Sequence, residues 1–213
     1  MLSLQTVGKS EDPVEACAKP VLFIDFNGTL CYDYFWRSLE EDLKGQVQQF
    51  LFVDNKHIVY DWMRGCYTAE EVNTMVAEDL KVSFEELWSV FKSDCRTMNI
   101  SEVVLKKING LRSRYRTILS TDNMDSLDRF TIPALQLNRY FDVISNSYNE
   151  GKSKDDEDGG LFQKYIELYE ADTTRSVLID DSEKTCAIFE QLGGRALRVT
   201  PHQDLLFHLE RLE

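Results

Sequence analysis

Four apolar residues run directly into an acid and a turn near the start of this chain, as Val21-Leu22-Phe23-Ile24-Asp25-Phe26-Asn27-Gly28-Thr29-Leu30. Short apolar runs rich in β-branched residues are typical of buried strands in a parallel sheet. Asp, Asn, Gly and Thr favour turns, so we expect the strand to end after Ile24. Asp25 would then stand at the carboxyl end of that strand.

Four later runs share this pattern, at residues 117–119, 141–144, 176–179 and 196–199. Helical patterns over 161–170 and 183–192 separate the later runs, and Gly193-Gly194 ends the second of these helices. Alternation of strands with helices predicts βαβ units. The expected fold class is therefore α/β, a Rossmann-like parallel sheet with helices on both faces.

The interval between the first two strands is far longer than a crossover needs, because 95 positions separate Asp25 from Ser120. Helix-start patterns recur within it, at Ser38 with Glu41, Thr68 with Glu71, Ser83 with Glu86, and Ser101 with Glu102. We therefore expect a helical domain over residues 31–111, of about four helices. The α/β core would comprise residues 20–30 and 112–213, preceded by a flexible extension over residues 1–19.

Composition narrows the function classes. The 213 residues include 37 Asp and Glu against 24 Lys and Arg, a net charge of −13. Nucleic acids and anionic membranes both require a positive surface, so we expect neither as a partner. The five cysteines are scattered without C-x-x-C spacing, which favours a reducing, cytoplasmic location over a disulfide framework. No stretch approaches the roughly 20 apolar residues of a membrane span.

Acids or hydroxyls follow three of the expected strands, at Asp25, Ser120 and Asp180-Asp181. Parallel strands bring their carboxyl ends to one edge of the sheet, where ligands bind in open α/β folds. Crowded carboxylates repel one another and so favour a bound cation, and hard oxygen ligands suit Mg²⁺. Lys152 or Lys154 could add a fixed positive charge. A carboxylate nucleophile, a metal, a hydroxyl and a lysine together indicate phosphoryl transfer.

This ordered set resembles the haloacid dehalogenase (HAD) superfamily, most of all its Mg²⁺-dependent phosphatases with a helical cap inserted after the first strand. The motifs that carry the resemblance are residues 21–30, Thr117-Ile118-Leu119-Ser120, Gly151-Lys152-Ser153-Lys154 and Val177-Leu178-Ile179-Asp180-Asp181-Ser182. The cap segment Trp62-Met63-Arg64-Gly65 is also similar. The resemblance spans about residues 20–200 and implies a small phosphorylated metabolite as substrate.

The resemblance implies roles for the acidic residues. Asp25 would be the nucleophile that becomes an aspartyl phosphate, and also a direct Mg²⁺ ligand. Asp181 would be a second ligand, and the backbone carbonyl of Asn27 a third. Asp180 would hold a metal-bound water or orient Asp181.

Further residues would bind the phosphoryl group. Ser120, with Thr121 beside it, would donate to a phosphoryl oxygen, although both could instead be simple helix caps. Lys154, three residues after Gly151, is preferred to Lys152 as the bridge between nucleophile and phosphate. Backbone N–H groups of Phe26, Asn27 and Gly28 would line the phosphate. In the cap, Arg37 is a candidate for binding a substrate anion.

Asn27 departs from the family pattern, in which the phosphatases have an aspartate that serves as general acid and base. An amide exchanges no proton, so the expected loss of activity is ~10²–10⁴-fold. The sequence leaves open a specialised phosphatase, a protein that binds a phosphorylated ligand or a protein partner without turnover, and a chain mutated at this position. Hydrolysis of a carbon–halogen bond needs no Mg²⁺, and Asp180-Asp181 argues against it.

Overall fold

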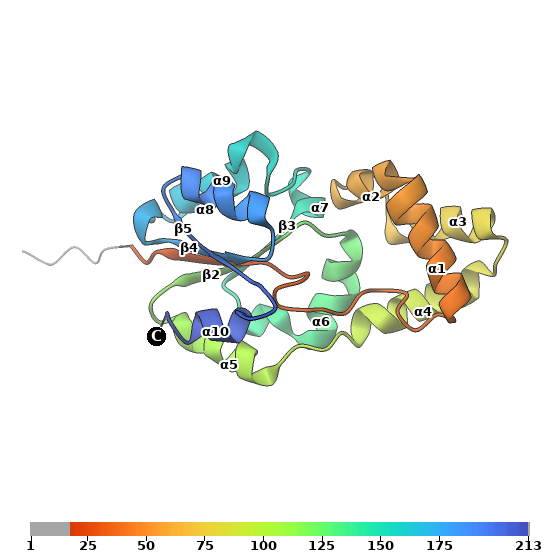
Figure 1. Cartoon of the computed structure of the whole chain (residues 1–213), viewed down its shortest axis with the longest axis horizontal. Helices are drawn as coiled ribbons and strands as arrows, with labels where there is room; N and C mark the ends of the chain where they lie inside the picture. The colour runs from red at the N-terminus through yellow and green to blue at the C-terminus, as the bar shows by residue number, and fades with distance from the viewer. Residues whose placement is uncertain (1–17, 213) are drawn as a thin grey trace, which may run out of the picture.

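The computed structural model describes residues 18–212, and its core is a five-stranded parallel sheet (Figure 1). The strand order is β3-β2-β1-β4-β5, which places β1 at the centre. The strands are β1 (Val21–Ile24), β2 (Arg116–Thr121), β3 (Val143–Asn146), β4 (Val177–Asp180) and β5 (Arg195–Arg198). The predicted α/β class is confirmed. Most of the expected extension over residues 1–19 lies outside the described residues.

Ten α-helices within residues 18–212 surround or extend from this sheet. They are α1 (Glu41–Gln49), α2 (Lys56–Met63), α3 (Ala69–Leu80), α4 (Phe84–Arg96), α5 (Glu102–Leu111), α6 (Ile132–Leu135), α7 (Ser147–Glu150), α8 (Gly160–Leu168), α9 (Glu183–Gln191) and α10 (Leu205–Leu209). Two π-helical turns occur at Phe50–Asp54 and Leu127–Thr131. None of these helices is long and apolar enough to cross a membrane.

Strand β1 is fully buried because its side chains alternate between two apolar layers. Leu22 and Ile24 pack in the layer that contains α5 and α10. Val21 and Phe23 face the opposite layer, in which Phe23 makes edge-to-face contacts with Phe162 of α8. Helices on both faces thus exclude water from the middle of the sheet.

A separate apolar core holds α1–α4 together in a second lobe (Figure 1). Trp36 is buried in this core, and its indole N–H donates to Asn73 Oδ1 at 3.1 Å. Helix α5 packs instead on the sheet, through residues such as Val104 and Ile108. We therefore propose that the helical unit ends with α4, and not at residue 111 as the sequence suggested. The segment over residues 34–96, which contains helices α1–α4, is called the helical lobe below.

Buried hydrogen bonds fix the helical lobe to the core. The Asp125 carboxylate, 4% exposed, accepts from Trp62 Nε1 at 2.8 Å and from the Ala69 N–H at 3.2 Å. Ser147 Oγ donates to the Met63 carbonyl at 2.7 Å. The segment between α2 and α3 is therefore held in a defined position over the carboxyl edge of the sheet.

The predicted helix starts differ in outcome. Thr68 forms a full capping box with Glu71, and Ser83 accepts from the Glu86 N–H. Ser38 does not cap α1, which begins at Glu41 after Glu40, because its hydroxyl donates to Asp94 Oδ1 at 2.6 Å. Ser101 precedes α5 without a side-chain cap. Helix α2 has no side-chain cap, and no start pattern in the sequence predicted it.

The capping box gives a first prediction. Thr68→Ala removes the acceptor for the Glu71 N–H, so we expect the free energy of unfolding to fall by about 1 kcal/mol. Urea unfolding followed by circular dichroism measures this change. Thr74→Ala is the matched control, because the Thr74 hydroxyl bonds within α3 to the Glu70 carbonyl and caps nothing. An equal loss in both variants would contradict the capping role.

Candidate active site

Three carboxylates meet at the carboxyl edge of the sheet, as the sequence predicted. Asp25 follows β1, and its N–H donates to the Ile179 carbonyl of β4 at 3.0 Å. Asp180 is the last residue of β4, and Asp181 follows it. Ligand oxygens of the three side chains lie within 4.8 Å of one another. Residues 155 positions apart in sequence are thus neighbours because β1 and β4 pair in parallel.

Lys154 is the cation of this cluster. Its Nζ lies 2.7 Å from Asp25 Oδ1 and 2.6 Å from Asp180 Oδ2, and the residue is 5% exposed. The Lys154 N–H donates to Asp122 Oδ1 at 2.9 Å, which fixes the loop that follows α7. Lys152, the alternative from the sequence, pairs with Glu157 at the surface. Of these two lysines, Lys154 is therefore the one that reaches the carboxylates.

Burial and repulsion set the protonation of the cluster. Burial raises the pKa of Asp25 to about 7, with Lys154 opposing and Asp180 adding to the shift. Burial and then Asp180 also raise the pKa of Asp181. Burial by itself lowers the pKa of Lys154. The negative charges of Asp25 and Asp180 raise it by more, so the pKa of this lysine lies above its ordinary value. Three ionised acids and one lysine would leave two negative charges, a balance that one divalent cation restores.

The turn after β1 is shaped around Asp181. Gly28 has φ +76°, and a Cβ atom there would lie 2.6 Å from Asp181 Oδ2. Glycine thus leaves room for this carboxylate. The Gly28 N–H donates to the Cys31 carbonyl at 2.9 Å within this turn, and its role in lining the phosphate stays a prediction. Phe26 and Asn27 remain candidates, and the Phe26 ring is buried in the core.

Ser120 and Thr121 end β2 beside Asp25, because Ile24 pairs with the preceding Leu119. Both side chains are 1% exposed. No helix begins directly after them, so neither is a helix cap. The buried Thr121 hydroxyl has no hydrogen-bond partner among the described residues.

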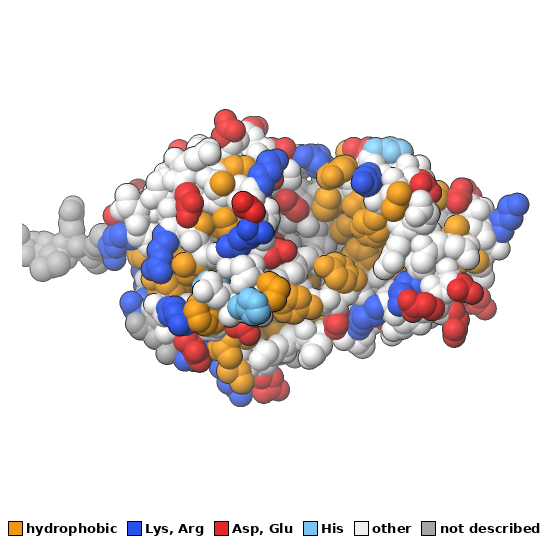
Figure 2. Space-filling view, viewed as in Figure 1, with side chains coloured by type: hydrophobic (Ala, Val, Ile, Leu, Met, Phe, Trp, Pro, Cys, Tyr) orange, Lys and Arg blue, Asp and Glu red, His pale blue; other side chains and the backbone are white. Residues whose placement is uncertain are grey.

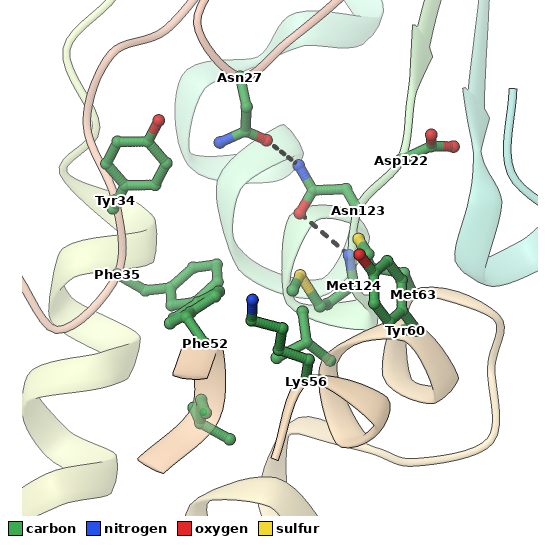
Figure 3. Close-up of a pocket in the computed structure, with 12 residues that line it drawn as sticks. Asn27, Tyr34, Phe35, Phe52, Lys56, Tyr60, Met63, Asp122, Asn123 and Met124 are labelled. Atoms are coloured by element: carbon green, nitrogen blue, oxygen red, sulfur yellow. Dashed lines mark hydrogen bonds between the residues drawn. The ribbon is translucent and has the colours of Figure 1, made fainter. Parts of the chain in front are cut away.

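Asn27 is held by a residue that the sequence analysis did not single out. Its Oδ1 accepts from Asn123 Nδ2 at 2.6 Å, and Asn123 Oδ1 in turn accepts from the Met124 N–H at 3.0 Å (Figure 3). Asn123 lies only three residues after Ser120, so its place just past the strand end was the available signal. The Asn27 amide is therefore oriented as a hydrogen-bond acceptor.

Comparisons with known proteins bear on the fold. No family model and no curated protein matches this chain. A HAD family enzyme from Bacteroides thetaiotaomicron superposes with a TM-score of 0.69 at 21% identity, covering 91% of this chain and 99% of that one. This chain has the fold of the HAD superfamily. A predicted HAD-like hydrolase from Porphyromonas gingivalis has a TM-score of 0.67 at 19% identity, covering 92% of this chain and 98% of that one.

Two further solved structures share this fold, one of them a second structure of the Bacteroides enzyme. The Bacteroides enzyme was also solved in complex with magnesium and inorganic phosphate, at a TM-score of 0.67, 20% identity, and coverage of 87% and 96%. A 2-haloacid dehalogenase from Pseudomonas syringae has a TM-score of 0.60 at 16% identity, with coverage of 86% and 87%. One structure with this fold thus holds magnesium and phosphate and another is named as a dehalogenase, so a proposal for the function of this chain must rest on its own residues.

Proposed function

We propose that this HAD-fold chain is a Mg²⁺-dependent phosphatase that hydrolyses a small phosphate monoester through Asp25. The observation that carries the proposal is the buried Lys154 bridge between Asp25 and Asp180, with Asp181 beside it. Asp25, Asp181 and the backbone carbonyl of Asn27 would hold the metal, with Asp180 orienting them. Bound Mg²⁺ would neutralise charge on the phosphoryl oxygens.

The protein's own residues account for the covalent steps. An Asp25 carboxylate oxygen forms a bond to phosphorus as the bond from phosphorus to the leaving oxygen breaks. Lys154 and Ser120 position the phosphoryl group. Water then attacks the aspartyl phosphate, which releases phosphate and restores the carboxylate. Asn27 supplies no proton in either step, so leaving groups that depart as stable anions should react best.

A second candidate function is the binding of a phosphorylated ligand with little or no turnover. The observation in its favour is that the Asn27 amide, hydrogen-bonded to Asn123, stands where the resembling phosphatases have an acid. Dehalogenation is the weaker alternative, since it has no use for the paired acids Asp180 and Asp181.

Release of p-nitrophenol from p-nitrophenyl phosphate tests the proposal, because this aryl leaving group needs little acid catalysis. We expect slow hydrolysis with Mg²⁺ that falls to the buffer rate when EDTA removes the metal. Hydrolysis that is indifferent to EDTA would contradict the proposal. Phosphate binding with Mg²⁺ in calorimetry, without hydrolysis, would instead support the second candidate.

A further inference from the structure

A cavity of about 370 Å³ opens between the core and the helical lobe, a volume within the usual range for small-molecule sites. Asn27, Asp122 and Asn123 line it from the core, and Phe35, Phe52 and Lys56 from the helical lobe (Figure 3). Asp122 also accepts from the Lys154 N–H. The cavity therefore adjoins the carboxylate cluster through Asp122 and Asn27.

The cavity wall from the helical lobe is apolar and aromatic. Tyr34, Phe52 and Tyr60 line it while remaining 56%, 43% and 55% exposed. Figure 2 shows hydrophobic side chains gathered in the hollow between the two lobes. Exposed apolar patches of this kind mark ligand sites. Aromatic rings favour another flat ring in stacked or edge-to-face contact.

Lys56 adds a positive charge to this wall. Its ammonium group points into the cavity (Figure 3) and makes no ion pair or hydrogen bond within residues 18–212. Lys56 is also the first residue of α2, whose first turn contains no acid. A cation there opposes the helix dipole, so helix stability does not explain this lysine. In a chain of net charge −13, an unpaired lysine in an aromatic cavity matches an anionic ligand group.

We infer that the substrate is a phosphate monoester of a flat, apolar alcohol, preferably aromatic, that carries a second anionic group such as a carboxylate. The inference rests on the proposed function, since it places the phosphoryl group at Asp25. The ring lies among Tyr34, Phe52 and Tyr60, and the second anion meets Lys56. Arg37 does not take that role, because its guanidinium donates to the Asp94 and Thr97 carbonyls.

Non-hydrolysable phosphonates test this inference by calorimetry in the presence of Mg²⁺. We expect benzylphosphonate to bind at least ~10-fold more tightly than methylphosphonate, because the ring buries apolar surface. A carboxyl group at position 4 of the benzylphosphonate ring should increase the affinity further, by up to about fivefold. Lys56→Met should remove that increment while leaving the preference for benzylphosphonate over methylphosphonate.

Lys106→Met is the matched control, since Lys106 pairs with Glu102 on α5 and lines no part of this cavity. Equal affinity for benzylphosphonate with and without the carboxyl group would overturn the inference that the substrate carries a second anionic group. Equal affinity for methylphosphonate and benzylphosphonate would overturn the inference that the substrate carries a flat, apolar group. The proposed function fails separately, if p-nitrophenyl phosphate is not hydrolysed while this selectivity among phosphonates is intact.

Discussion

Asn27→Asp should raise the Mg²⁺-dependent turnover of p-nitrophenyl phosphate by ~10²–10⁴-fold, the usual contribution of a positioned general acid and base. The change is nearly isosteric. An aspartate oxygen in place of Asn27 Oδ1 would still accept from Asn123 Nδ2, so the new carboxyl group should adopt the observed orientation. It would lie two residues from Asp25, where it can donate a proton to the leaving oxygen and then activate water.

The controls for this variant address charge and mechanism. Asn138→Asp adds one negative charge at an exposed position and should leave turnover unchanged. Asp25→Asn in the Asn27→Asp background should abolish the gain, since no aspartyl phosphate can then form. Mass spectrometry of residue 27 establishes the baseline, because Asn-Gly sequences are prone to deamidation. Equal turnover by the unaltered protein and the Asn27→Asp variant would mean that proton transfer does not limit the reaction.

Local pattern was sufficient to predict the sheet and its acidic edge. Strands such as Val21–Ile24 and Val177–Asp180 are short, continuous apolar runs, which only a sheet covered on both faces can bury. Once the strands are parallel, the meeting of Asp25 with Asp180 follows from topology. This is why residues far apart in sequence could be assigned to one cluster without coordinates.

What the sequence could not provide depends on packing between elements. The apolar stripe of α5 does not say whether it faces the sheet or the helical lobe, and its packing on the sheet is the reason for the boundary that we propose after α4 in place of residue 111. Ser38 fits a capping pattern, but its hydroxyl donates a hydrogen bond to Asp94, which lies 56 positions away in the sequence. The bond between Asn123 and Asn27 likewise arises only when the turn after β1 meets the segment after β2, and the direction of Lys56 depends on how α2 lies against the core.

Lys154→Met should lower the free energy of unfolding of the metal-free protein by about 3–5 kcal/mol, the usual loss when one partner of a buried ion pair is removed. Lys154 contacts both Asp25 and Asp180, and all three residues are at most 5% exposed. Without the ammonium group, these carboxylates lack a counter-charge. Thermal unfolding in EDTA should show the midpoint falling by roughly 10 °C. Added Mg²⁺ should recover part of the loss.

The pH dependence of this loss identifies its cause. The folded pKa of Asp25, about 7, exceeds its ordinary value of 3.8, so the folded state binds more protons than the unfolded state between those values. Stability from this group is present at low pH and is lost as pH rises through 7. The positive charge of Lys154 lowers the pKa of Asp25, so the Lys154→Met substitution should raise this pKa further. The deficit of Lys154→Met should therefore be smaller at pH 5 than at pH 8.

Lys152→Met supplies the matched control, because Lys152 pairs with Glu157 at the surface, two residues from Lys154 along the same loop. Ion pairs between exposed side chains contribute little to stability, so the unfolding midpoint of Lys152→Met should barely move at either pH. Equal losses in the two variants would mean that the loop, and not the buried charge, determines the effect. A pH-independent deficit confined to Lys154→Met would point to lost packing of the lysine stem, and the carboxylates would then need another source of neutralisation.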